Sequence, residues 1–160
     1  MHPNNGFIER ILLIDDDPDD CILFRQALQE FATGIEVFTT DRIENAIRKV
    51  EQCFPNLIFL DIKIPGLDGF DFLRTMRYHP KTARIPVIMY SSSQNPVDVT
   101  RSYGLGANLF FRKPSSYTGI VENLRAIFEL PWNDPNEITL QFFRNGKYAP
   151  FQLNEPGESC

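Results

Sequence analysis

Acidic, hydroxyl and amine side chains follow short apolar segments at four places along the chain. Asp15 and Asp16 come after ILLI, Asp61 comes after LIFL, Ser91 ends PVIMYS and Lys113 ends NLFFRK. Carboxylates brought close together repel one another, and a hard divalent cation such as Mg²⁺ relieves that repulsion with oxygen ligands. An ionised aspartate beside such a cation can attack phosphorus, while an ammonium and a hydroxyl bind the transferred group.

Each of these residues also has an ordinary structural explanation. The run DDDPDD can be the start of a helix, with Asp17 as the N-cap and with Asp19 and Asp20 at the positive helix end. Asp61 can be a turn residue before Pro65, and a lysine that precedes a proline is usually a surface residue. Only the combination of all four positions indicates chemistry.

Strand-like apolar segments alternate with helical patterns five times. The strand-like segments are ILLI (11–14), IEVFT (35–39), LIFLD (57–61), PVIMYS (86–91) and NLFFRKP (108–114). Such an alternation predicts a parallel sheet that is covered by helices on both faces. The carboxyl ends of parallel strands meet at one edge, where ligands of such sheets bind. The fold would therefore bring the four positions together.

Composition narrows the class of protein. A chain of 160 residues with 42% apolar residues suits one globular domain. The net charge of -5 argues against nucleic acid as a partner, and no apolar run approaches the roughly 20 residues that span a membrane. The start, MHPNNGFIER, has no apolar signal core, so we expect a cytoplasmic protein. The three cysteines are scattered and lack metal-ligand spacing.

The last 30 residues form a separate segment. We expect the main domain to cover residues 1–130 and an aromatic-rich extension to cover 131–160. The dipeptide Asn145-Gly146 predicts a two-residue turn and a β-hairpin over 137–151. Its aromatic side chains are costly to leave in water, so the hairpin should pack on the domain, extend a sheet edge or contact a second subunit. From residue 154 we expect disorder.

Four segments together resemble the receiver domain of two-component response regulators, the CheY-like family. They are ILLIDDD, LIFLDIKIPGLDGF, PVIMYSSS and GANLFFRKP, and the resemblance covers about residues 8 to 130. It implies a flavodoxin-like (βα)5 fold, a doubly wound α/β sheet with strand order 2-1-3-4-5.

The resemblance also implies a function. The chain would be a stand-alone response regulator, a cytoplasmic phosphoprotein that receives a phosphoryl group from a sensor histidine kinase or a phosphotransfer protein. It would catalyse only its own phosphorylation and dephosphorylation, so it would not be an enzyme for other substrates. Its output would be binding of a downstream protein. A homodimer could form through the fourth helix, fifth strand and fifth helix, or through the extension.

Site roles follow from the same resemblance. Asp61 corresponds to the phosphoacceptor, and Asp15 and Asp16 to the acidic pair that binds Mg²⁺ with it. The backbone carbonyl of Lys63 corresponds to a further ligand of the metal.

Three more residues correspond to groups that hold and sense the phosphoryl group. Ser91 and Lys113 would bind it once it has arrived. Phe110 stands at the position of the switching aromatic residue, where many members of the family have tyrosine. If Ser91 moves toward the phosphoryl group, Phe110 could rotate inward and change the surface of the fourth helix, fifth strand and fifth helix.

Two other functions fit parts of the pattern. A haloacid dehalogenase-type phosphatase also forms an aspartyl phosphate, but it needs a second aspartate where this chain has Lys63. A phosphorylation-independent scaffold would not need the set of acidic, serine and lysine residues described above. Lys63 is also an extra cation beside Asp61, and we expect its side chain to alter the hydrolysis rate or the metal affinity.

Overall fold

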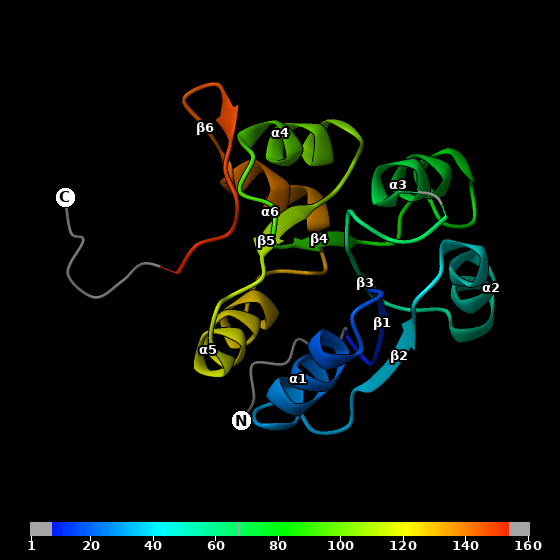
Figure 1. The fold of residues 1–160 in the computed structure, drawn as a ribbon. Helices are drawn as coiled ribbons and strands as arrows, with labels where there is room; N and C mark the ends of the chain where they lie inside the picture. The colour runs from blue at the N-terminus through cyan, green and yellow to red at the C-terminus, as the bar shows by residue number, and fades with distance from the viewer. Residues whose placement is uncertain (1–7, 67, 154–160) are drawn as a thin grey trace.

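Five parallel strands form one sheet in the order β2-β1-β3-β4-β5 (Figure 1). The computed structural model describes residues 8–66 and 68–153. The strands are β1 (Arg10–Ile14), β2 (Glu36–Thr40), β3 (Leu57–Leu60), β4 (Val87–Ser91) and β5 (Leu109–Arg112). Both the fold class and the strand order confirm the sequence-based prediction.

The central strands are apolar throughout because both of their faces are covered. Ile11 and Leu13 point into the core on the side of α1 (Pro18–Gln29) and α5 (Tyr117–Phe128). Leu12 and Ile14 point into the other core layer. That layer is covered by α2 (Ile43–Cys53), α3 (Gly69–Tyr78) and α4 (Pro96–Gly104). A strand buried on both faces has no polar side of its own, which accounts for the uninterrupted apolar segments.

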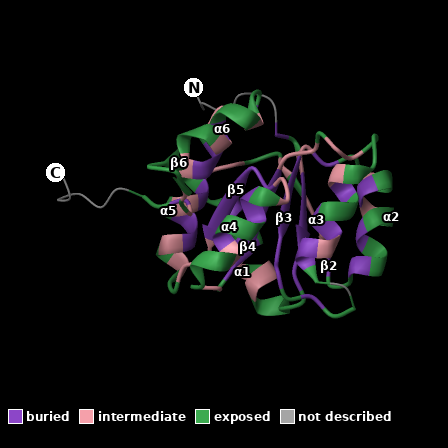
Figure 2. Cartoon of the chain, turned by 90° about the horizontal axis from the view of Figure 1, so that it is seen from above, coloured by how far each residue is buried: buried purple, intermediate pink, exposed green. Residues whose placement is uncertain are grey.

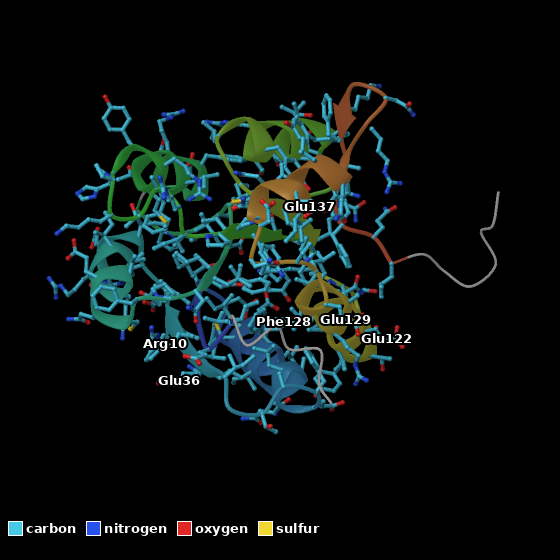
Figure 3. The ribbon with its side chains drawn as sticks, turned by 180° about the vertical axis from the view of Figure 1, so that it is seen from behind. Arg10, Glu36, Glu122, Phe128, Glu129 and Glu137 are labelled. Atoms are coloured by element: carbon cyan, nitrogen blue, oxygen red, sulfur yellow. The ribbon has the colours of Figure 1, made fainter. Side chains whose placement is uncertain are left out.

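The helices turn their apolar sides to the sheet and their polar sides to water (Figure 2). Phe128 at the end of α5 is buried, whereas Glu122 in the helix and Glu129, the residue after it, are exposed (Figure 3). Helix α1 begins as the sequence predicts, because the Asp17 side chain accepts hydrogen bonds from the amides at positions 19 and 20. Within the described segments no helix combines the length and the apolar character needed to cross a membrane.

The extension differs from the predicted hairpin over 137–151. Residues 135–141 form helix α6 (Pro135–Gln141), and only β6 (Phe143–Arg144) and β7 (Lys147–Tyr148) pair as strands. The helix forms because Asp134 caps it and Pro135 occupies its first position. The predicted turn is present: Asn145 and Gly146 have φ of 54° and 76°, which is the backbone of a two-residue hairpin turn.

The extension packs on the domain that precedes it. Trp132, Ile138 and Phe151 are buried in the same core layer as α1 and α5. The Phe151 amide donates a 2.7 Å hydrogen bond to the carbonyl of Phe110 on the outer strand β5. The hairpin lies beside α4 (Figure 1). Of the expected arrangements, packing on the domain is therefore the one observed, while the disorder expected from residue 154 lies outside the described residues.

We predict that Phe151 anchors the extension. Replacing it with alanine should lower the free energy of unfolding by about 3 kcal/mol, because a buried aromatic ring leaves a cavity. The matched control is Phe143→Ala in the exposed strand β6, which should cost about 1 kcal/mol or less. Urea denaturation of both variants measures the difference. Equal losses would show that the extension is not anchored through Phe151.

Candidate functional site

Three carboxylates meet where β1 and β3 end. The last residues of these strands, Ile14 and Leu60, are neighbours in the parallel register, so Asp15 and Asp61 follow them side by side. The Asp61 amide donates to the Ile14 carbonyl at 3.0 Å, which fixes this alignment. One carboxylate oxygen from each of Asp15, Asp16 and Asp61 lies within 4.8 Å of the others. The structure therefore brings together the three side chains that the sequence assigns to a metal.

The Asp15 carboxylate is in an environment that favours a cation. Its side chain is fully buried, and burial raises its pKa, although the nearby Lys113 ammonium acts in the opposite direction. Asp15 Oδ1 accepts a hydrogen bond from the Asp17 amide, whereas Oδ2 receives no directed hydrogen bond. Three carboxylates that share one ammonium keep an excess of negative charge, and a divalent cation between the three aspartates would offset it. The residues present thus fit Mg²⁺.

Lys113 places its ammonium among the carboxylates. Its Nζ lies 2.8 Å from an Oδ2 atom of each of Asp15, Asp20 and Asp61. Burial alone would lower the pKa of Lys113, but its bonds to the three aspartates outweigh burial and raise it above the usual value. The side chain therefore stays cationic at neutral pH. The contact with Asp61 brings Lys113 to its predicted place, and the contact with Asp20 was not predicted.

Ser91 and Lys63 border the same open cavity. Its lining includes Asp61, Lys113 and both of these residues. Ser91 is buried at the end of β4, and its carbonyl accepts a 2.9 Å hydrogen bond from the Lys113 amide, which ties the ends of β4 and β5 together. Lys63 is exposed, and its amide faces Asp61 Oδ1 at 3.4 Å. The structure thus places both residues at the cavity, and the roles that the resemblance implies for them remain predictions.

Phe110 lies behind the cavity rather than in its wall. The ring is fully buried in the core layer beneath α4, and Phe110 pairs with Met89 on β4, two residues before Ser91. Its amide donates to the Tyr103 hydroxyl at 3.1 Å. The predicted rotation of this ring remains a prediction.

Gly69, the first residue of α3, has a steric role that the sequence analysis did not predict. A Cβ atom at Gly69 would lie only 2.1 Å from the carbonyl oxygen of Asp61. The Gly69 amide donates a 2.7 Å hydrogen bond to the Ile62 carbonyl. Only glycine lets the start of α3 approach the backbone of Asp61 so closely. The Asp68 side chain caps that helix by accepting from the amide of Asp71, so the pair DG in PGLDGF was a usable signal.

Comparison with known proteins shows the family of this chain. Residues 11–125 match the family described as the response regulator receiver domain, and the chain belongs to this family. Receiver domains bind Mg²⁺ at an acidic pocket and interact with histidine kinases or phosphotransfer proteins.

Individual relatives support the same fold. The sensory transduction protein BceR of Halalkalibacterium halodurans is 31% identical over 130 residues, which are 81% of this chain and 54% of that protein. The crystal structure of the phosphorylated cyanobacterial phytochrome response regulator RcpA superposes with a TM-score of 0.70 at 29% identity, covering 76% of this chain and 92% of RcpA. The Mn²⁺-bound form of response regulator Rcp1 gives a TM-score of 0.67 at 28% identity, with coverage of 74% and 91%. The chain thus spans about half the length of the curated relatives it matches.

We predict that Asp15 is needed for binding a divalent cation. Asp15→Asn should weaken Mn²⁺ binding at least about tenfold, as measured by electron paramagnetic resonance. In the unchanged protein the affinity should fall as the pH is lowered toward the raised pKa of Asp15, because protons then compete with the metal. Asp19→Asn removes the same charge from the exposed start of α1 and should change little. Equal effects in both variants would contradict a site at Asp15.

Proposed function

We propose that the chain is a phosphorylation-dependent switch in which Asp61 accepts a phosphoryl group from a phosphohistidine. One observation supports this most directly. Asp61 shares the ammonium of Lys113 at 2.8 Å and lies with two other aspartates in a cluster that fits a divalent cation. The ionised carboxylate is the form that attacks phosphorus, and cations beside it offset the charge on the phosphoryl oxygens.

Transfer of the phosphoryl group needs no reactant other than the donor phosphohistidine and water. A carboxylate oxygen of Asp61 attacks phosphorus, a P–O bond forms and the P–N bond to the donor imidazole breaks. The electron pair of the broken bond stays on the imidazole nitrogen, which takes a proton from water. Hydrolysis reverses the state: a water oxygen attacks phosphorus, the P–O bond to Asp61 breaks with its electrons returning to the carboxylate, and inorganic phosphate leaves.

The remaining residues hold the groups in place. Asp15, Asp16 and Asp61, with the backbone carbonyl of Lys63, would hold Mg²⁺. When bound, the ion neutralises charge on the phosphoryl oxygens. Lys113 lies ready to donate to one of these oxygens.

The readout involves the end of β4 and its neighbour on β5. The Ser91 hydroxyl turns to the new phosphoryl group. Its movement leaves room for Phe110 to shift against α4, which changes the surface that a downstream protein binds.

The proposed partners are proteins. The donor is a sensor histidine kinase or a phosphotransfer protein, and RcpA, named as a phytochrome response regulator, makes a phytochrome-type kinase a reasonable first choice. One relative, MtrA of Mycolicibacterium smegmatis, is named as DNA-binding, and this chain matches 55% of its length. For the present chain we propose stand-alone action without nucleic acid, in keeping with its net charge of -5.

Incubation with acetyl phosphate and Mg²⁺ tests the proposal. The protein should gain a single phosphoryl group by mass spectrometry, and Asp61→Asn should gain none. Asp71→Asn, which removes an exposed carboxylate in α3, should still be phosphorylated. Turnover of many equivalents of a phosphate ester would favour a phosphatase, and no incorporation at all would favour a scaffold.

The exposed Lys63 gives a separate prediction. Lys63→Ala should tighten Mg²⁺ binding and speed loss of the phosphoryl group, each about two- to threefold, because one partly screened cation is removed. Isothermal titration and the decay of the phosphorylated protein measure the two effects. Lys81→Ala, an exposed lysine beyond the far end of α3, is the control. If neither quantity changes, the Lys63 side chain takes no part.

A further inference from the structure

Asp20 is an acidic residue at the site that the proposed transfer does not use. It lies in the first turn of α1, where its amide faces the capping side chain of Asp17 at 3.4 Å. Its side chain does not stay at the helix end but crosses to the end of β5, where Oδ2 accepts a 2.8 Å hydrogen bond from Lys113 Nζ. Asp20 also lines the cavity that contains Asp61.

The ammonium of Lys113 has fewer N–H donors than the acceptor oxygens around it could use. It carries three N–H groups and no acceptor. In this structure it donates directed hydrogen bonds to Asp20 and Asp61, and it is paired with Asp15 as well. A phosphoryl group on Asp61 brings new acceptor oxygens that need the same donors. Asp20 therefore competes with the phosphoryl group for Lys113.

The charges at the site point in the same direction. Asp15, Asp16 and Asp61 form the cluster that fits a divalent cation, and Asp20 lies outside that cluster. Asp20 adds a fourth carboxylate to the three of the cluster, whereas Lys113 supplies a single positive charge to them. An aspartyl phosphate adds further negative charge. The Asp20 carboxylate therefore repels the group that Asp61 is to receive.

We infer that Asp20 is a positioning residue that occupies one of the three N–H groups of Lys113 and competes with the phosphoryl group for it, so that phosphorylation is slower and the phosphorylated state shorter-lived than the other site residues alone would allow. This inference depends on the proposed function. The Asp20 side chain is 30% exposed, so screening limits the effect. We expect changes of about threefold.

The test compares substitutions that separate charge from shape. Asp20→Asn keeps the size of the side chain and removes the charge; it should speed phosphorylation by acetyl phosphate and slow the later loss of the group, each about threefold. Asp20→Glu keeps the charge and should resemble the unchanged protein. Asp19→Asn, one residue earlier and without contact to Lys113, controls for the net charge of the helix start.

Other results would overturn the inference. A packing role would make Asp20→Glu the damaging variant and Asp20→Asn harmless. A role as the base that activates water would slow decay in Asp20→Asn but leave uptake unchanged. Equal effects of Asp19→Asn would assign the result to general surface charge.

A second measurement separates this inference from the proposed function. If the unchanged protein takes up no phosphoryl group, the proposed function fails, and Mn²⁺ binding then tests the contact between Asp20 and Lys113. Asp20→Asn should weaken Mn²⁺ binding about threefold, because Lys113 is released toward the metal-binding carboxylates and one negative charge is lost. Asp19→Asn should not. Unchanged Mn²⁺ affinity in Asp20→Asn would contradict the role of Asp20.

Discussion

One ammonium shared among carboxylates is the interaction on which the site depends. Parallel strands bring Asp15 and Asp61 to the same edge of the sheet, where their charges would repel each other at close range. Lys113 enters from β5 and contacts both. The contact with Asp15 Oδ2 is not a directed hydrogen bond, so the negative charge of the carboxylates is only partly offset until another cation is present. The same shortage of positive charge is the reason why the three carboxylates fit a divalent cation.

Much of the fold and site could be predicted because their signals are local. Apolar segments buried on both faces identify the strands, and the residues that end the strands must meet at one edge. Asp15, Asp61 and Lys113 were predictable for this reason. Asp20 was not, because the contact depends on how α1 is placed against β5, 93 residues away in the chain.

The extension shows why short segments mislead. The sequence ITLQFF (138–143) favours a strand, because it is rich in β-branched and aromatic residues. A helix forms there instead, because the Asp134 cap and a proline at the first helical position, Pro135, favour helix initiation. The turn at Asn145 was predictable, since few other sequences adopt a left-handed backbone there at low cost. Packing against α4 then places the short hairpin.

The hydrogen bond between Phe151 and Phe110 has a consequence for how molecules of this protein meet. An outer strand with free backbone groups is a template on which another chain can add a strand. On β5 that opportunity is reduced, because the Phe110 carbonyl accepts from the Phe151 amide and the Phe110 amide donates to the Tyr103 hydroxyl. The Tyr103 hydroxyl in turn donates to the Ala149 carbonyl of the extension. Edge-to-edge growth of the sheet is thus opposed on this side by a segment of the same polypeptide, and β2 is left as the outer strand more open to such growth.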